Sequence, residues 1–191
     1  MSFIPDRQYA LSLLKEYVHS AGMLRHAYAV EAVMRHFAAF FGEDAEKWGV
    51  VGLLHDIDYE MYPEEHCAKA REILSAKGLP EEYIRAVQSH GYKFVNDIKP
   101  QSTMEKVLFT IDELTGLIAA CALLRPSKSV LDLEVSSVKK KWSQKAFAAG
   151  VNRETIEEGA AMLGMELGDI IGHTIEGMRA AAEETGLKGN L

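Results

Sequence analysis

Four of the seven histidines stand at positions where the helical spacing of the chain would accept a buried leucine. Those four are His26, His55, His66 and His90. His26, for example, precedes Val30 and Val33 by four and seven residues, which places all three side chains on one face of a helix. Two carboxylates, Asp56 and Asp112, share this inward placement. Because a buried carboxylate without a partner is costly, a cation is expected next to each of them.

Imidazole and carboxylate together make a donor set that suits borderline divalent metals such as zinc, iron, manganese, cobalt and nickel. One inward histidine is usually an ordinary core residue, but four on different helices, with two carboxylates, indicate a metal site. Six ligands exceed what one tetrahedral zinc ion with a bound water requires. They are about right for two octahedral ions that share one carboxylate. If the helices converge, the sequence therefore predicts two divalent metal ions.

The elements that position these residues are predicted to be helices nearly throughout. A glycine such as Gly42 after an apolar periodic segment indicates a helix end. Proline followed by two acidic residues indicates helix starts at Pro63 and Pro80, and Ser102 with Glu105 forms a capping box. The expected helices cover 23–41, 44–57, one segment after Pro63, one after Pro80, 102–124, 152–163 and 166–184, and a frayed tail is expected over 186–191.

Composition and pattern exclude several classes of protein. The chain carries 21 basic and 28 acidic residues, and its net charge of −7 argues against binding to nucleic acid or to an anionic membrane. No apolar run reaches the roughly 18 residues of a membrane helix, and the first residues do not resemble a signal peptide. Two cysteines suit a reducing compartment. We therefore expect a cytoplasmic protein. Since no segment has the period of a strand, we expect its fold to be all-α and compact.

A basic stretch follows the predicted helix of Asp112. Residues 125–145 contain six basic residues against two acidic ones, a local charge of +4. Arg125 is the first candidate for a contact with a substrate phosphate, because it directly ends that helix. The next candidates are Lys128, Lys139 and Lys140. A lysine run is equally often a solvated helix face, and both interpretations stay open.

The segment Leu53-Leu54-His55-Asp56-Ile57 resembles the signature of the HD superfamily of metal-dependent phosphohydrolases. The resemblance extends to His26 upstream and to Asp112 in a Thr-Ile-Asp-Glu-Leu segment downstream, and it covers roughly residues 20–125. It implies an HD-domain helical bundle. Residues 1–125 would form the metal-binding core, and residues 126–191 a C-terminal helical extension packed on the same domain. The chain is also similar to bacterial proteins known mostly as predicted HD-domain hydrolases.

The resemblance also implies a role for each ligand. The first metal ion would be held by His26, His55, Asp56 and Asp112. Asp56 would bridge to a second ion held by His66 and His90, as in the binuclear branch of the superfamily. Asp58 and Tyr59 stand where many relatives have glycine and a phosphate-binding lysine. Asp58 is therefore expected either as a general acid or water-orienting group or as a turn residue at a helix end. Cys67 is expected to point about 100° away from His66.

The expected function is hydrolysis of a small phosphorylated metabolite, most simply a nucleotide, by a metal-activated water. Asp56 and Asp58 are the candidate catalytic residues. Two alternatives remain open at this stage: a di-iron oxygenase of the HD type, which uses the same ligands, and a non-catalytic signalling module. The C-terminal helices are expected either to cap the pocket or to build a homodimer interface.

Overall fold

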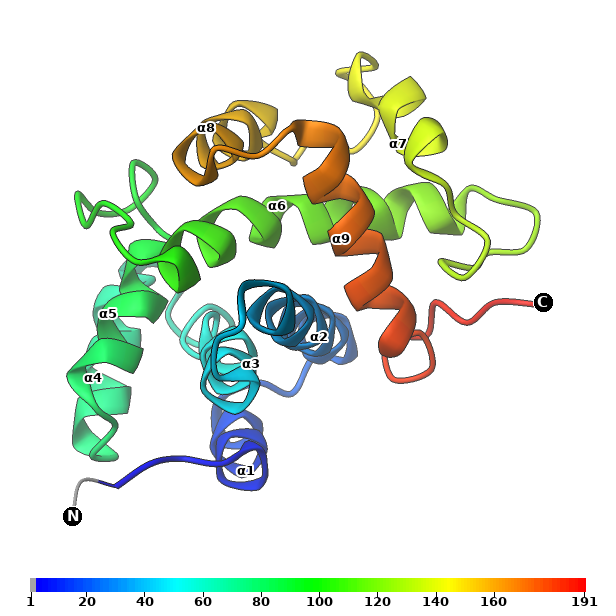
Figure 1. Cartoon of the computed structure of the whole chain (residues 1–191). Coiled ribbons are helices and arrows are strands. Elements are labelled where there is room, and N and C mark those ends of the chain that lie inside the picture. The colour runs from blue at the N-terminus through cyan, green and yellow to red at the C-terminus, as the bar shows by residue number, and fades with distance from the viewer. Residues whose placement is uncertain (1–2) are drawn as a thin grey trace.

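Residues 3–191 are described by a computed structural model, in which two long helices, α2 (Ala21–Phe41) and α6 (Thr103–Leu123), pack against each other near the centre (Figure 1). A third helix, α3 (Ala45–Leu54), lies against α2. The all-α prediction is confirmed. Within residues 3–191 the regular elements are helices, and the only β-type pairing is an isolated bridge between Tyr92 and Asn96.

Shorter helices surround this centre in the first half of the chain. α1 (Arg7–Tyr17) packs against α3, and α4 (Ala68–Ala76) pairs with α5 (Glu81–Ser89). A short 3-10 turn, η1 (Pro63–Glu65), lies between α3 and α4. α5 contacts both α3 and α6, and thus the helix that leads into His55 and Asp56 and the helix that carries Asp112.

Three further helices follow residue 125, and all of them contact the same core. They are α7 (Val135–Trp142), α8 (Arg153–Leu163) and α9 (Leu167–Ala180). α8 packs on α6, and α9 contacts both α2 and α6, as Figure 1 shows in its yellow and orange segments. The C-terminal helices thus cover faces of α2 and α6 that would otherwise be exposed.

Two glycines permit helices to approach α2 closely. A Cβ added at Gly52 of α3 would lie 2.9 Å from Cγ of Met34 and 3.1 Å from Cα of Glu31. A Cβ added at Gly177 of α9 would lie 2.7 Å from Cα of Val33. Real Cβ atoms almost never come so close to another atom. The absence of a side chain at these two glycines therefore lets α3 and α9 pack closely on α2.

Most predicted helix ends agree with the structure. Gly42 has a φ of 71° and ends α2 in the left-handed conformation. Ser102 and Glu105 form the expected capping box at the start of α6. Asn152 caps α8 with a hydrogen bond from the Thr155 amide to its side chain.

Other boundaries differ from the prediction. α3 ends at Leu54 rather than near residue 57, and the chain then turns through the histidine and aspartate pair. Pro63 begins only the turn η1, and the following α-helix starts at Ala68. α9 ends at Ala180, four residues early. The helices α1 and α7 were not predicted.

The expected frayed tail is wrong. Leu187 is buried, and its carbonyl accepts a hydrogen bond from the Val130 amide at 2.9 Å. The Asn190 amide donates to the Ser127 carbonyl at 2.8 Å. Backbone pairing to the loop after α6 therefore holds the end of the chain in place, which a pattern of side chains could not reveal.

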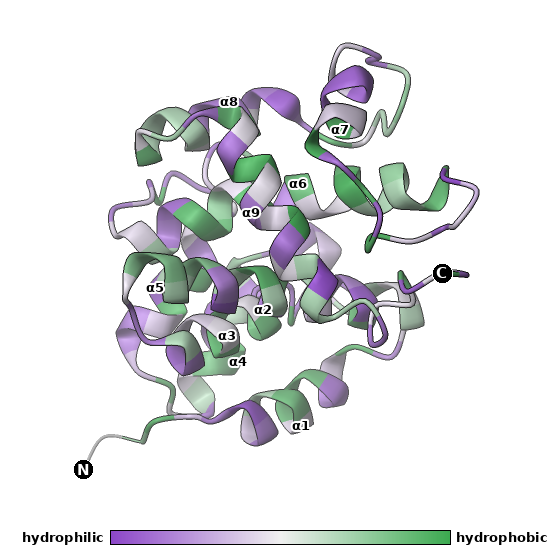
Figure 2. Cartoon of the chain, turned by 45° about the vertical axis from the view of Figure 1, so that its right-hand side comes forward, coloured by the Kyte–Doolittle hydropathy of each residue, from purple (hydrophilic) through white to green (hydrophobic). Residues whose placement is uncertain are grey.

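The helices enclose one apolar core. Its largest fully buried side chains include Phe37, Leu54, Leu108 and Ile111, from α2, α3 and α6. Figure 2 shows hydrophobic and hydrophilic residues on the same helices, as amphipathic helices around a shared core require. Among the helices of residues 3–191, none is long and apolar enough to cross a membrane.

Candidate metal centre

The six side chains predicted as metal ligands come together at one place, although five separate parts of the chain supply them. α2 supplies one, the turn at the end of α3 supplies two, and the segment after η1, the end of α5 and the middle of α6 supply one each. In that order they are His26, His55, Asp56, His66, His90 and Asp112. The packing of α2, α3, α5 and α6 around a common point therefore assembles the cluster.

Four of these side chains form a first group. Nε2 of His26 lies 3.1 Å from Nε2 of His55 and 2.9 Å from Oδ1 of Asp112. Nε2 of His55 lies 3.3 Å from the same Asp112 oxygen and 3.4 Å from Oδ2 of Asp56. The donor atoms of three of them, His26, His55 and Asp112, all lie within 4.8 Å of one another.

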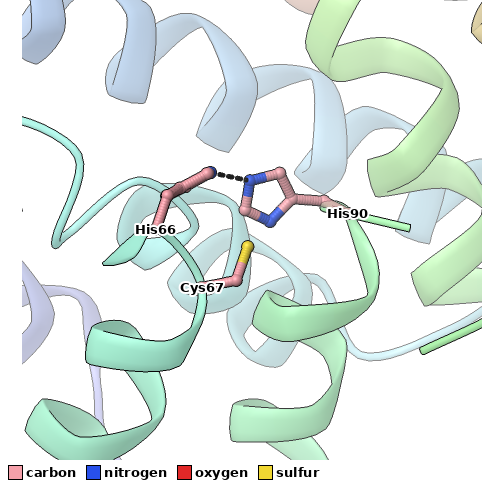
Figure 3. Close-up of side chains that lie close together, drawn as sticks. All are labelled: His66, Cys67 and His90. Carbon is pink, nitrogen blue, oxygen red and sulfur yellow. Dashed lines mark hydrogen bonds between the residues drawn. The ribbon is translucent and has the colours of Figure 1, made fainter. Parts of the chain in front are cut away.

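The second group lies on the other side of Asp56. Nε2 of His66 and Nε2 of His90 are 3.1 Å apart, and Figure 3 shows one ring nitrogen of each histidine directed at the other. Oδ1 of Asp56 lies 3.5 Å from Nε2 of His66 and 3.4 Å from Nε2 of His90. Each oxygen of Asp56 therefore faces a different pair of histidines, as a bridging carboxylate would.

The opposite ring nitrogens determine which atoms can bind a metal. Nδ1 of His55 donates to the carbonyl of Gly52 at 2.8 Å, and Nδ1 of His90 donates to the carbonyl of Val87. A carbonyl only accepts, so the proton of each neutral ring is on Nδ1 and the lone pair is on Nε2. Nε2 of His66, whose Nδ1 is bonded to Asp58, also carries a lone pair, and at 3.1 Å from Nε2 of His90 the two lone pairs repel unless a proton or a metal ion lies between them. This donor set therefore fits a bound divalent metal.

The side chain of Asp58 fixes the ring of His66 in the same way. Its Oδ1 accepts a hydrogen bond from Nδ1 of His66 at 2.8 Å, and its Oδ2 accepts one from the Ala70 amide at 2.8 Å. The side chain is fully buried and does not line the pocket. The structure therefore does not place Asp58 where a general acid or a water-orienting group would act; it lies in the turn after α3, as the other expectation had it. Its carboxylate orients His66 from behind.

Burial and neighbouring opposite charges shift the pKa values of these side chains in opposite directions. Burial alone would raise the pKa of Asp112, but hydrogen bonds from His26 and His55 outweigh it and hold that pKa well below its usual range. Likewise, burial would lower the pKa of His55, but the charges of Asp56 and Asp112 raise it well above the ordinary value. The inward carboxylates do have cationic partners, as expected from their burial. Without metal, those partners are the imidazoles.

Cys67 is the residue of this site that the sequence interpretation placed wrongly. Its φ of 66° lies in the left-handed region, and neither Cys67 nor His66 is inside a helix, so the rule of 100° per residue does not apply. Figure 3 shows its thiol turned toward His90, and its sulfur belongs to a group with His66 and His90 that could hold a metal. Burial raises the pKa of the Cys67 thiol, as do the charges of Asp58 and Asp56, so the sulfur keeps its proton at neutral pH.

A pocket of about 440 Å³ opens over the cluster, a size typical of small-molecule sites. Five of the six predicted ligands line it, and His55 lies beneath. The rest of its lining is mostly aromatic and aliphatic, with one further carboxylate and several small residues. These are Tyr59, Gly91, Phe94, Val95, Phe109, Glu113, Gly116, Val151 and Thr155. A larger cavity of about 660 Å³ lies elsewhere, beside Trp48 and Ser102.

The basic residues expected to contact a substrate phosphate are not in this pocket. Arg125 makes a two-pronged ion pair with Asp132, at 2.9 and 2.8 Å. α6 continues 11 residues beyond Asp112 to Leu123, or about 16 Å, before Arg125 is reached. Arg125 follows the far end of the helix that carries Asp112, and the length of that helix separates it from the site.

The three lysines are also elsewhere. Lys128 is exposed in the loop after α6, and Lys140 is exposed on α7. The Lys139 ammonium lies against Gly168 of α9. Of the residues described, no lysine or arginine lines the pocket over the cluster. The other interpretation of the lysine run, as a solvated helix face, agrees better with the structure.

Comparison with known proteins gives one positive result. A family model described as HD domain matches residues 23–117, a range that includes all six clustered side chains. No significant match was found among curated proteins or among solved structures.

Proposed function

The chain belongs to the HD-domain family, and on that basis we propose that it is a metal-dependent phosphohydrolase with two divalent ions. One observation supports this proposal above the others. In each of two histidine pairs the Nε2 atoms lie 3.1 Å apart, with the carboxylate of Asp56 between the pairs. Only a proton or a metal ion between the two nitrogens of a pair removes their repulsion, and members of the family bind divalent metals.

Each ion would have its own set of protein ligands. His26, His55, Asp56 and Asp112 would hold the first ion, and His66, His90 and Asp56 the second. When bound, such ions acidify a coordinated water and offset negative charge on a phosphoryl group. Iron, manganese, cobalt, nickel and zinc all accept these donors.

The protein itself would position the reacting groups. The carbonyls of Gly52 and Val87 and the carboxylate of Asp58 keep three Nε2 atoms pointing at the same small volume. Phosphoryl transfer depends mostly on positioning and electrostatics, so no nucleophilic side chain is required. We propose a small phosphorylated metabolite as substrate and, given two buried free cysteines, the reducing cytoplasm as location.

Metal analysis with an activity screen tests the proposal. The purified protein is analysed for bound metals and is then incubated with nucleotides, sugar phosphates and dinucleoside polyphosphates in the presence of manganese, cobalt or nickel. We expect about two metal ions per chain and release of phosphate from at least one substrate class. Absence of phosphate release from every class, together with iron-dependent oxygen uptake, would support an oxygenase instead. Absence of both activities would support a non-catalytic module.

A further inference from the structure

Resting on the proposed function, we infer that the substrate is a phosphomonoester whose alcohol carries an aromatic or apolar group, and that polyphosphates are disfavoured. Two observations carry this inference. The wall of the pocket beside the metal ligands is aromatic and aliphatic, and among the described residues the pocket lining contains carboxylates but no lysine or arginine.

The aromatic wall lies at the mouth of the pocket. Phe94 is 49% exposed, and Tyr59 and Val95 are exposed to a similar extent. The Tyr59 ring packs edge-on against His66, with ring centroids 5.0 Å apart, so this wall begins at the metal ligands themselves. Phe109 of α6 forms the buried end of the same wall. Exposed rings that line a concave pocket offer a planar or apolar ligand group a surface on which to stack.

The backbone holds this wall in place. The Gly91 carbonyl accepts hydrogen bonds from the amides of Phe94 and Val95 at 3.1 and 3.0 Å. The Lys93 amide donates to the Asn96 carbonyl at 2.9 Å, and the Asn96 side chain donates to the Gln88 carbonyl at 2.8 Å. A closed turn directly after His90 therefore presents Phe94 outward. A surface that is held in place in this way loses little entropy when it binds a ligand.

The charge of the pocket limits how many phosphates it can take. Asp56, Asp112 and Glu113 contribute three negative charges to its lining. Two divalent ions would bring the total to +1. Arg25 lines an adjoining cavity of about 250 Å³ that shares His26 and Gly116 with the pocket, and it would add one more positive charge. A phosphomonoester carries about two negative charges and would balance this total, whereas a nucleoside triphosphate, with about four, would exceed it.

The reaction in question is a simple hydrolysis. The oxygen of water bonds to phosphorus while the bond from phosphorus to the ester oxygen breaks. The alcohol leaves with one proton, and inorganic phosphate is the other product. The apolar alcohol would rest against Phe94 and Tyr59 while the phosphate lies over the histidines.

A comparison of three substrates tests the inference. We expect kcat/KM of the metal-loaded protein to be at least about tenfold higher for 2-naphthyl phosphate than for glycerol phosphate or ATP. If glycerol phosphate or ATP is hydrolysed equally well or better, the inference is wrong but the phosphohydrolase stands. If no phosphate is released from any of the three or from the wider screen, the proposed function itself fails.

A binding measurement on the metal-free protein tests the wall independently of catalysis. The probe is 2-naphthol, an uncharged leaving group followed by its own fluorescence. Phe94→Ala is expected to weaken its binding on the order of tenfold, and Phe94→Tyr to retain it. Phe40→Ala is the matched control, because Phe40 is 51% exposed but lies on α2 away from the pocket. Equal binding by the Phe94→Ala and Phe40→Ala variants, both folded by circular dichroism, would overturn the inference.

Discussion

Asp58 orients His66, a proposed metal ligand, and would do so without touching the metal. Both of its oxygens are occupied, one by Nδ1 of His66 and one by the Ala70 amide. An asparagine has only one acceptor oxygen there, and its amide group would face a donor on the other side. Asp58→Asn is therefore expected to lower the affinity of the second ion by about 10- to 100-fold, and to affect the first ion far less, only through the shared Asp56. Titration of the apoprotein against a competing chelator measures both affinities. Wild-type affinity for both ions would contradict the role of Asp58.

Stoichiometry tests the assignment of ligands to the two ions. His66→Ala should reduce the metal content from about two ions per chain to about one, because the first ion keeps its own four ligands. Asp56→Ala should reduce binding at both positions, since one oxygen faces each group. Elemental analysis gives the ratio, and His19→Ala, an exposed position outside the cluster, is the control. Unchanged metal content in His66→Ala would show that the second position is not a metal site.

Prediction from sequence succeeded best at the scale of single residues. Periodicity alone placed His26 and Asp112 on inward faces, and the two side chains do meet, although 86 residues separate them. It failed where function depended on backbone conformation or on distance in space. The left-handed Cys67 and the ion pair of Arg125 with Asp132 have no signature in the spacing of residues.

At the scale of elements, the contact of α9 with α2 depends on one missing side chain. A Cβ at position 177 would lie 2.7 Å from the backbone of Val33, which cannot move without bending α2. Gly177→Ala is therefore expected to destabilise the protein by about 1–3 kcal/mol, measured by urea unfolding. Gly172→Ala on the same helix meets only Cγ2 of Val135, at 3.7 Å. That variant should be neutral or slightly stabilising, because alanine favours helix. Equal stability of the two variants would contradict the close-packing argument.

The contact of α2 with α9 also contains a histidine pair outside the metal centre. Nε2 of His36 lies 3.0 Å from Nδ1 of His173. Burial and the nearby charge of His173 lower the pKa of His36, and Glu176 only partly opposes them. The unfolded chain therefore takes up a proton near pH 6.5 that the folded protein resists. The contribution of His36 to stability is complete above that pH and decreases as the pH falls below it.

This dependence can be measured by urea unfolding between pH 7.5 and 5.5. The free energy of unfolding of His36→Gln should fall less steeply with decreasing pH than that of the wild type. His19→Gln, which changes an exposed histidine and leaves the metal centre intact, provides the comparison. Parallel pH profiles for the two variants would show that His36 is not responsible.

The helices that were not predicted share a simple property. α7 is only eight residues long, buries only Val138 and consists largely of serine and lysine, so few apolar residues mark it as a helix. α1 buries Ala10, Leu13 and Leu14, a short stripe within eleven residues. By contrast, α2 and α6 bury side chains on every turn and were predicted nearly to the residue. Periodicity detects a helix in proportion to the surface that the helix buries.

At the scale of the whole molecule, the metal centre connects elements that are distant in sequence. Bound ions would tie α2, the end of α3, the segment after η1, α5 and α6 to common points. Removal of metal with EDTA is therefore expected to lower Tm, and restoring the metal should reverse the change. A ligand at about 100 times its Kd adds about 2.7 kcal/mol per site. Differential scanning calorimetry measures the shift. An unchanged Tm after verified loss of metal would mean that the helices converge without help from the ions.

One carboxylate, that of Asp56, stands between the two histidine groups, and this would make the affinities of two bound ions interdependent. An ion on one oxygen of Asp56 changes the electron density and the orientation that the other oxygen offers. By thermodynamic reciprocity, whatever effect the first ion has on the second, the second has on the first. The two positions would then fill as a linked pair rather than as independent sites. The cellular supply of either metal would therefore set the occupancy of both.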